Sequence, residues 1–372
     1  MLDAFEGSVE AVVGYWDFPV SSMVPLLCRA RGLRSASLEA VLKCEHKYWS
    51  RIEQQKVIDA VPRFALIDLE APSSPPSGLD YPMWLKPVKS YGSELAFHVG
   101  SDEEFRKAVI EIRDGIARIG GPFEFVMDQV ELPSDIAEVG GQACLAEEAL
   151  RGDQVTLEGF CREGAVTIYG VVDSVTYAES PSFLRYQYPS RLPAQVLGRT
   201  EDLTRRVIAQ VGLTDSTFNV EFFHDAERDD IRLLEVNPRH SQSHAQLFEQ
   251  VDGVSNHECM LRLAVGRDPD LPHGKGPYDV AAKWFLRRFS DGEVRRCPTA
   301  EQVAQLEREV PGATVQLLVR EGDRLSNLHG QDSYSYQLAH VYVGADSEDD
   351  LVGKFDRCVD GLSFEIDDVP GV

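Results

Sequence analysis

Apolar and polar side chains alternate with two different periods along this chain. The run FNVEFFHD alternates with the period of a strand, DAERDD is a polar turn and IRLLEVN is a returning apolar run, so residues 218–237 predict a β-hairpin. A second hairpin is predicted over residues 156–177, with its turn at residues 162–164. Apolar stripes at helical spacing predict amphipathic helices over residues 101–120 and 199–213. The pattern therefore indicates a mixed α and β protein.

The two ends of the chain predict further elements of both types. Residues 10–43 predict a strand, a helix, a strand and a helix in that order. Residues 280–372 predict a strand, a helix, two strands, a helix and a final strand, which we interpret as a separate α+β domain. A segment rich in Pro and Ser at residues 71–78 predicts a flexible connector. Because 372 residues are too many for one ordinary core, two or three domains are expected.

The composition indicates a soluble globular protein and excludes several classes of partner. Hydrophobic residues make up 43% of the chain, and no apolar run is long enough to span a bilayer. With 61 acidic and 37 basic residues the net charge is -24, which opposes binding to nucleic acid or to an anionic membrane. The amino terminus lacks the features of a signal peptide and the cysteines include no CxxC pair, so a reducing cytoplasm is expected. A polyphosphate ligand would need cations gathered locally.

The hairpin at residues 218–237 carries three oxygen ligands close to an arginine. Glu235 and Asn237 are two apart on one strand and therefore share a face, and Glu221 can face them from the partner strand. Mg²⁺ prefers such oxygen ligands and leaves its other positions to water and phosphate oxygens. With Arg239 beside them, these residues predict a site for a metal-bound triphosphate. The alternative is a charged hairpin on a solvated surface.

Basic side chains gather in two segments that precede this hairpin. In the first, a helix predicted to begin near Ser37 carries four cations at helical spacing, which are Lys43, Lys47, Arg51 and Lys56. In the second, an apolar run ends at Lys86 and is followed by a small polar loop made of Lys89, Ser90, Tyr91, Gly92 and Ser93. Small residues let backbone N–H groups approach an anion, while lysines add point charges. The alternatives are a solvated helix face and an ordinary turn, and the phosphate-loop pattern GxxxxGK[ST] is absent.

Four segments follow one another in an informative order. The lysine-bearing helix is followed by the Lys–Pro strand with its loop, by EEALRGDQVTLEGF at residues 147–160, and by NVEFF and LLEVNPR. In this order and spacing the chain resembles the ATP-grasp superfamily over most of its length, from about residue 40 to residue 265. The resemblance implies an α/β (α+β) fold of the ATP-grasp type, in which two α+β subdomains clasp ATP.

The resemblance also implies a division into domains. Residues 1–60 are similar only to the later half of the usual preceding domain and would form a reduced amino-terminal α/β domain. Residues 61–265 would form the ATP-grasp domain, with residues 61–146 as a small lid subdomain and residues 147–265 as a core subdomain. Residues 266–372 would form the C-terminal α+β domain.

Roles for individual residues follow from the same resemblance. Lys47 and Lys86 look like the two phosphate-binding lysines of the family, and with Arg239 they are expected to act in catalysis. The nucleotide is further expected to contact a mobile loop and an interdomain hinge, represented here by Lys89, Ser90, Gly92, Ser93, Glu147, Glu148, Ala149 and Leu150. Glu221, Glu235 and Asn237 match the ligands of Mg²⁺ or Mn²⁺. Where the family usually has a carboxylate for the ribose hydroxyls, this chain has Gln154, and Asp153 is an alternative.

The activity implied by the resemblance is an ATP-dependent ligation. A small carboxylic acid would be phosphorylated to an acyl phosphate and condensed with an amine, with release of ADP and phosphate. Biotin carboxylase-type carboxylation and a nucleotide-binding regulatory protein without turnover are the alternatives. The expected partners are small-molecule carboxylate and amine substrates, with no nucleic acid or membrane, and the reduced first domain favours a homodimer.

Segments between the motifs offer candidate contacts for the substrate. Residues 241–243 follow the metal strand and could hydrogen-bond a substrate, although a simple helix start is the alternative. Residues 15–17 follow a predicted strand, at the end where α/β sheets bind ligands, although the aromatics among them also suit a core. Residues 181–190 could bring Arg185 or Tyr186 to the site. One sequence cannot fix the geometry of these loops, so it leaves the substrates undetermined.

Overall fold

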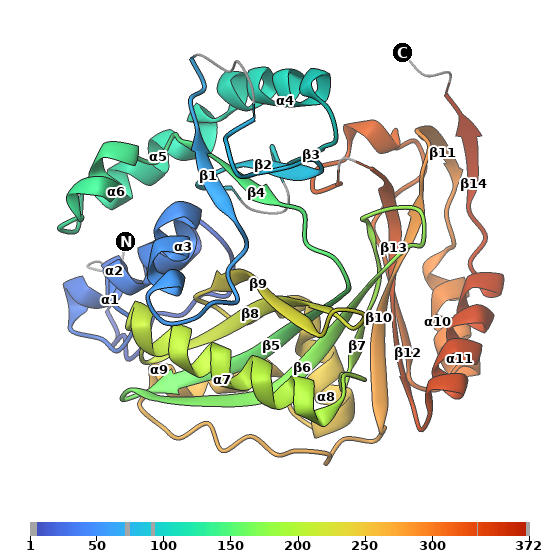
Figure 1. Cartoon of the computed structure of the whole chain (residues 1–372). Coiled ribbons are helices and arrows are strands. Elements are labelled where there is room, and N and C mark those ends of the chain that lie inside the picture. The colour runs from blue at the N-terminus through green and yellow to red at the C-terminus, as the bar shows by residue number, and fades with distance from the viewer. Residues whose placement is uncertain (1–5, 71–74, 91–93, 333, 370–372) are drawn as a thin grey trace.

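The computed structural model describes residues 6–70, 75–90, 94–332 and 334–369 (Figure 1). The helices are α1 (Val20–Arg31), α2 (Leu38–Glu45), α3 (Lys47–Gln55), α4 (Asp102–Gly115), α5 (Ala117–Met127), α6 (Ser134–Val139), α7 (Ala194–Val211), α8 (Ala245–Asp252), α9 (Asn256–Ala264), α10 (Ala300–Glu309) and α11 (Glu348–Gly361), with short 3₁₀ turns η2 (Gln242–His244) and η3 (Leu325–Asn327). The strands are β1 (Phe64–Ile67), β2 (Met83–Pro87), β3 (Phe97–Val99), β4 (Cys144–Glu148), β5 (Asp153–Arg162), β6 (Ala165–Thr176), β7 (Phe183–Tyr188), β8 (Ser216–Asp225), β9 (Asp230–Asn237), β10 (Val280–Arg288), β11 (Gly292–Arg296), β12 (Ala313–Leu317), β13 (Tyr336–Ala345) and β14 (Glu365–Asp368).

A small antiparallel sheet in the order β1-β4-β2-β3 lies above the large sheet in Figure 1. Its strands alternate between two faces, so Met83 and Leu85 pack on Phe105 and Val109 of α4. Lys86 is one residue on from Leu85 and therefore lies on the other face. The apolar core under α4 thus fixes which way the lysine points.

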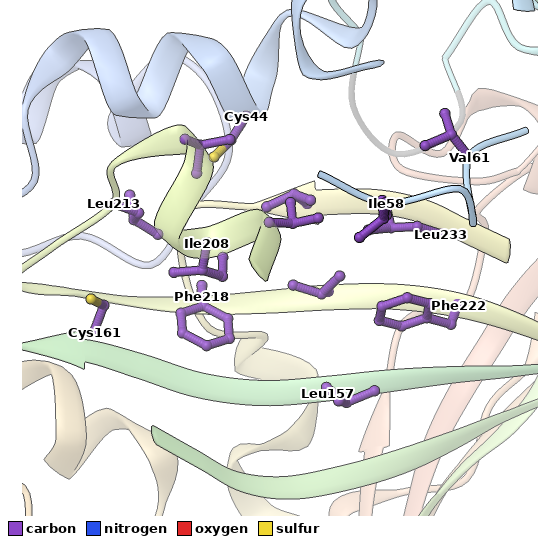
Figure 2. Close-up of a cluster of buried hydrophobic side chains, with 14 of the residues drawn as sticks. Cys44, Ile58, Val61, Leu157, Cys161, Ile208, Leu213, Phe218, Phe222 and Leu233 are labelled. Carbon is purple, nitrogen blue, oxygen red and sulfur yellow. The ribbon is translucent and has the colours of Figure 1, made fainter. Parts of the chain in front are cut away.

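The large sheet has eight strands in the order β12-β13-β10-β7-β6-β5-β8-β9. One of its faces is apolar, and Figure 2 shows Leu157, Phe218 and Phe222 of this face, with Ile208 of α7 next to Phe218. Successive side chains of a strand point to opposite faces. Polar side chains such as Glu221 therefore lie on the opposite face, and the burial of the apolar face determines where they stand.

The two predicted hairpins are confirmed as the pairs β5–β6 and β8–β9. The helices predicted over residues 101–120 and 199–213 are confirmed as α4 and α7, although α4 ends at Gly115 and α5 follows at once. Helix α7 begins at Ala194, five residues before the predicted range, and ends at Val211, where Gly212 caps it in the left-handed conformation (φ 74°) that glycine adopts without strain.

The C-terminal segment shares the large sheet with the middle of the chain. Strand β10 pairs with β7 on one side and with β13 on the other, so β10, β12 and β13 extend the sheet rather than forming one of their own. Their outer face is covered by α10 and α11. The predicted order of elements missed β11, which pairs with β14 in a separate two-stranded sheet. The division at residue 266 therefore stays a prediction, with one sheet running across it.

The prediction for residues 10–43 was wrong in its strands and correct in its helices. Helices α1 and α2 are present, but no strand occurs between residue 6 and β1. The apolar run Val12–Gly14 lies against α1, where a Cβ on Gly14 would stand 2.5 Å from Val20 Cγ1. A run of β-branched residues becomes a strand only where another strand pairs with it, and here a helix lies beside it instead.

The basic helix predicted to run through residues 43–56 is broken at His46. His46 has extended dihedral angles (φ -83°, ψ 98°), and its imidazole accepts a hydrogen bond from the backbone N–H of Trp49 at 3.2 Å. It therefore ends α2 and caps α3. As a result Lys47 opens a new helix, and its own N–H donates to the carbonyl of Val88 at 2.8 Å.

None of the helices in the described part of the chain is long and apolar enough to cross a bilayer.

Candidate active site

The hairpin β8–β9 holds the three predicted metal ligands on one face. Glu221 stands opposite Glu235, and Asn219 stands opposite Asn237. The amide nitrogen of Asn237 donates to Asn219 Oδ1 at 2.9 Å and to Glu221 Oε1 at 3.3 Å. Since both donors of this amide point at oxygens, its own oxygen is left to bind a cation. Asn219, which the sequence pattern did not single out, orients this ligand.

The pKa values of the two carboxylates are shifted in opposite directions. Burial, followed by the charge of Glu235, raises the pKa of Glu221 to about 7. Burial also disfavours the charged form of Glu235, but Lys47, Lys86 and Lys89 together hold its pKa below the usual value. Two facing carboxylates that repel each other form a site that a divalent cation would stabilise.

The two predicted phosphate lysines reach this hairpin from different parts of the fold. Lys47 Nζ lies 3.2 Å from Glu235 Oε1 and donates to the backbone carbonyl of Ser90 at 3.1 Å. Lys86 comes from β2 of the small sheet and forms an ion pair with Glu147. Burial lowers the pKa of Lys86, although Glu147 opposes this shift. The structure thus brings the lysines and the carboxylates together.

Arg51 connects the small sheet to the large one. Its Nε lies 2.6 Å from Glu147 Oε1, and its two terminal nitrogens donate to the carbonyls of Leu233 and Leu234 at 3.2 and 2.6 Å. Burial would raise the pKa of Glu147, but the charges of Arg51 and Lys86 lower it to about 2. The sequence pattern indicated Arg51 only as one of several helix cations. Its position one helical turn after Lys47 was the available signal that both point the same way.

Removing the charge of Glu147 is expected to destabilise the protein in a pH-dependent way. Glu147→Gln leaves Arg51 and Lys86 buried without a counter-charge, so the midpoint of thermal unfolding at pH 7 should fall by several degrees. The folded pKa lies below the unfolded one, so the carboxylate stabilises the native state at pH values above about 4.5 and loses this effect as the pH falls toward 2. The difference between variant and wild type should narrow over that interval.

Unfolding midpoints measured across this pH range check the expectation. Glu148→Gln is the matched control, because Glu148 is the next residue and pairs at 2.8 Å with Arg63, whose side chain is 56% exposed. Equal midpoints for Glu147→Gln and Glu148→Gln at pH 7 would contradict it.

The predicted phosphate loop is described only in part. Lys89 Nζ lies 3.2 Å from Glu45 Oε2 and stands over the rings of Phe18 and Phe123, so it is buried between the amino-terminal segment and α5. Ser90 uses its carbonyl to accept from Lys47. Gly92 and Ser93 lie outside the described residues. A contact between a phosphate and any of these residues stays a prediction.

The predicted hinge joins the last strand of the small sheet to the first hairpin of the large one. Glu148 pairs with Arg63, and the N–H of Ala149 donates to the carbonyl of Pro82 at 3.4 Å, after which Leu150 leads toward β5. Gln154 donates from its amide nitrogen to Glu221 Oε2 at 2.8 Å. It therefore stands beside a predicted metal ligand, and its contact with a ribose stays a prediction, as does the alternative of Asp153.

Arg239 is held by a residue from the amino-terminal segment. Its Nε and Nη2 lie 2.8 and 2.5 Å from Asp17 Oδ1. Residues 15–17, for which the sequence left a site contact and a core role both open, bring Asp17 to Arg239 without a preceding strand. Tyr15 packs on His257, with ring centroids 4.8 Å apart. In the pair with Arg239, Asp17 Oδ1 accepts from both Nε and Nη2 and so orients the guanidinium.

Of the two residues proposed from the segment 181–190, only one faces the site. Arg185 pairs with Glu348 at 2.8 Å on the side of the sheet that α10 and α11 cover. Tyr186 points the other way and packs edge-on against His244, with centroids 5.0 Å apart. The charges of Glu221 and Arg239 are close enough to affect the pKa of Tyr186, which burial raises.

The chain is similar in sequence to one protein family and in structure to several solved ligases and carboxylases. Residues 79–245 match the family model described as the ATP-grasp domain. The structure is similar to that of an L-amino acid ligase from Bacillus licheniformis, with a TM-score of 0.73, 14% identity, and coverage of 96% of this chain and 80% of that chain. It is also similar to a phosphoribosylglycinamide synthetase from Anaerococcus prevotii (TM-score 0.62, 14% identity, 96% and 83% coverage) and to a biotin carboxylase from Campylobacter jejuni (TM-score 0.65, 15% identity, 95% and 75% coverage). A search of curated proteins finds no match.

At these identities the structural similarity establishes the fold, and the family model adds the domain. The predicted order of lysine helix, lysine strand, hinge and metal hairpin falls largely within the matched residues. The chain therefore has the ATP-grasp fold and carries an ATP-grasp domain.

Proposed function

We propose that this protein is an ATP-dependent ligase that phosphorylates a small carboxylic acid and condenses the acyl phosphate with an amine, releasing ADP and phosphate. The convergence of Lys47 and Glu235 at 3.2 Å, beside Glu221 and Asn237, is the observation that carries the proposal. It gathers cations and oxygen ligands within a chain whose net charge is -24. The similarity to an L-amino acid ligase over 96% of this chain supports the same reaction class.

The residues fit a nucleotide with a divalent cation. Glu221, Glu235 and the free amide oxygen of Asn237 would hold Mg²⁺ or Mn²⁺ and leave the remaining positions to phosphate oxygens and water. The described residues contain no cluster of three or more His, Cys, Asp or Glu side chains arranged for a metal. A site of two carboxylates and one amide suits an ion that arrives with the nucleotide. Such an ion would neutralise charge on the phosphates.

The protein's part in phosphoryl transfer would be positioning and charge stabilisation. Lys47 and Lys86 would meet the oxygens of the phosphate chain, and Arg239, already oriented by Asp17, would brace the phosphoryl group as it passes to the carboxylate. The transferred phosphoryl leaves ADP with the bridging electron pair, and a carboxylate oxygen forms the new P–O bond. Holding both reactants in line can supply about 7–11 kcal/mol of the barrier.

Condensation would follow in the same site. The amine nitrogen attacks the acyl carbon, the phosphate departs with the C–O bonding pair, and the nitrogen loses a proton. Exclusion of water during this step protects the acyl phosphate from hydrolysis. No covalent nucleophile of the protein is required.

ADP release from a panel of carboxylates and amines tests the proposal. Purified protein with ATP and Mg²⁺ is expected to release ADP and phosphate in equal amounts, and only when a matching acid and amine are both present. Formation of AMP and pyrophosphate in place of ADP would refute the acyl-phosphate route.

Carboxylation is the second candidate, favoured by the similarity to a biotin carboxylase over 95% of this chain. It predicts that ADP release depends on bicarbonate and biotin rather than on an acid and an amine. Dependence on bicarbonate in the same assay would replace the first proposal with this one.

We also propose that the protein acts on small molecules in the cytoplasm and forms a homodimer. Its domains would be residues 1–60, 61–265 and 266–372. One of the similar structures is a biotin carboxylase domain dimer from Hydrogenobacter thermophilus, which supports self-association in this fold. Sedimentation of the full chain tests the homodimer.

A further inference from the structure

Lys283 on β10 is a buried lysine without a carboxylate partner. Its side chain is part of a residue that is only 3% exposed. Its Nζ donates to Ser243 Oγ at 3.2 Å and stands 4.8 and 5.6 Å from the ring centroids of Phe285 and Tyr342. No carboxylate in the described part of the chain lies within ion-pair distance of it. The ammonium therefore has one hydroxyl and two aromatic rings beside it, and the guanidinium of Arg287 stands over the same Phe285 ring at 5.3 Å.

The lack of a counter-charge distinguishes Lys283 from other cations whose side chains are little exposed. Those cations are each paired with a carboxylate, as in Arg51–Glu147, Lys86–Glu147, Lys89–Glu45 and Arg287–Asp332. The chain has 61 acidic residues, so partners are abundant. Burial, with a contribution from Arg287, lowers the pKa of Lys283 to about 7. A buried charge left unpaired costs stability, and such groups gather at binding sites.

The register of the large sheet places Lys283 on the same face as the candidate metal ligands. Gln154 stands opposite Ser174, Ser174 opposite Tyr186, and Tyr186 opposite Lys283. Residues opposite one another in paired strands share a face. Gln154 also contacts Glu221, so this row begins at the metal site. Three strand spacings separate its ends, a distance of about 14 Å.

The partner of Lys283 comes from the segment that follows the metal strand. Ser243 lies in η2, a few residues after Arg239, and Tyr186 packs against the neighbouring His244. The lysine is thus joined through Ser243 to the segment that carries the arginine of the reaction centre. A second cation, Arg287, shares the Phe285 ring but is already paired with Asp332. The aromatic rings beside Lys283 could contact the carbon skeleton of a small organic acid.

We propose that Lys283 and Ser243 bind a substrate carboxylate other than the one that is phosphorylated. This inference rests on the proposed ligase function and narrows its substrates to molecules that carry a spare carboxylate. Two sources have this chemistry: an amino acid serving as the amine substrate, or a dicarboxylic acid serving as the phosphoryl acceptor. The substrate carboxylate would supply the counter-charge that Lys283 lacks in the described part of the chain.

Calorimetry on the full chain with Mg²⁺ and a non-hydrolysable ATP analogue tests the inference. One arm compares L-alanine, L-leucine, L-phenylalanine and L-glutamate with their α-amides, and the other compares succinate and glutarate with their monoamides. At least one acid is expected to bind tenfold or more tightly than its amide. The arm in which this preference appears identifies the source of the carboxylate.

Lys283→Met removes the charge and keeps most of the volume of the side chain. The preference for acid over amide is expected to fall below twofold in this variant, and Ser243→Ala should reduce it in the same direction but less. Lys354→Met is the matched control, because Lys354 also stands over a tyrosine ring but pairs with Asp350 at 2.9 Å on α11. It should keep the full preference.

Thermal unfolding of the same variants separates binding from folding. Because Lys283→Met replaces a buried unpaired charge with an apolar group, its midpoint is expected to equal or exceed that of the wild type. A clear fall in its midpoint would assign Lys283 a structural role and overturn the inference.

The remaining outcomes are equally decisive. Amides that bind as tightly as acids, a Lys283→Met variant that keeps the preference, or a wild type that binds none of the panel would each overturn the inference. Binding of the nucleotide analogue is measured in the same samples. Its absence from the wild type would count against the ligase proposal itself, whereas its presence without an acid preference would count against the role of Lys283 alone.

Discussion

Glu235→Gln is expected to lower ATP-dependent ADP release at least a thousandfold, about 4 kcal/mol of transition-state stabilisation. Glutamine keeps the shape of the side chain but removes the charge that faces Glu221 across the hairpin and pairs with Lys47. Both the cation site and the orientation of Lys47 should suffer. Since these groups would stabilise charge that develops on the phosphoryl oxygens, their loss falls mainly on the transition state. Asn237→Ala should act in the same direction.

The measurement is the initial rate of ADP release with the substrate pair found in the panel. Glu227→Gln is the control, because Glu227 is an exposed carboxylate in the turn of the same hairpin, and it should stay within twofold of the wild type. A Glu235→Gln protein that turns over within tenfold of the wild type would remove this residue from the reaction.

Arg51→Met is expected to cause the largest loss of stability, about 3–5 kcal/mol, because it leaves a buried carboxylate without its main partner. Arg51 is 3% exposed and also supplies hydrogen bonds to two carbonyls of β9. Those carbonyls would lose the donors that Arg51 supplies, and Glu147 would keep Lys86 as its ion-pair partner. The residue therefore stabilises three segments of chain at once.

Urea unfolding followed by fluorescence measures this loss. Arg63→Met is the matched control, because Arg63 pairs with the adjacent Glu148 at 2.8 Å but is 56% exposed, and exposed pairs contribute less than about 1 kcal/mol. If the two variants unfold at the same urea concentration, Arg51 does not have the stabilising role inferred from its contacts.

Strand alternation carried enough information to predict the hairpin β8–β9 and the common face of Glu221, Glu235 and Asn237. Val220 and Phe222 had to face the core, so Glu221 had to face away from it, and a two-residue spacing put Asn237 on the side of Glu235. The lysine of β2 was predictable for the same reason, since Leu85 enters the core under α4. Wherever one face of a strand is apolar and packs on the core, the sequence also specifies that the alternate side chains point to the opposite face of the sheet.

Contacts between distant segments were not predictable in this way. Nothing in the sequence around Val12 and Val13 reveals that a helix, and no strand, lies beside them. The break at His46 depends on one imidazole accepting from the N–H of Trp49, where periodicity alone continues the helix. Nothing in the sequence around Lys283 marks it as buried, and only the pairing of β10 with both β7 and β13 encloses it.

The contacts of Arg51 have a mechanical consequence. Its guanidinium binds Glu147 near the end of β4, an inner strand of the small sheet, and two carbonyls of β9, so this end of the small sheet is attached to the large sheet at one point. A sheet attached at one point can rotate about that point, but it cannot slide past it. If β2 approaches a nucleotide, the small sheet would therefore rotate about Arg51. Lys86 lies close to this point and would move only a short distance. The far edge at β3 would travel furthest.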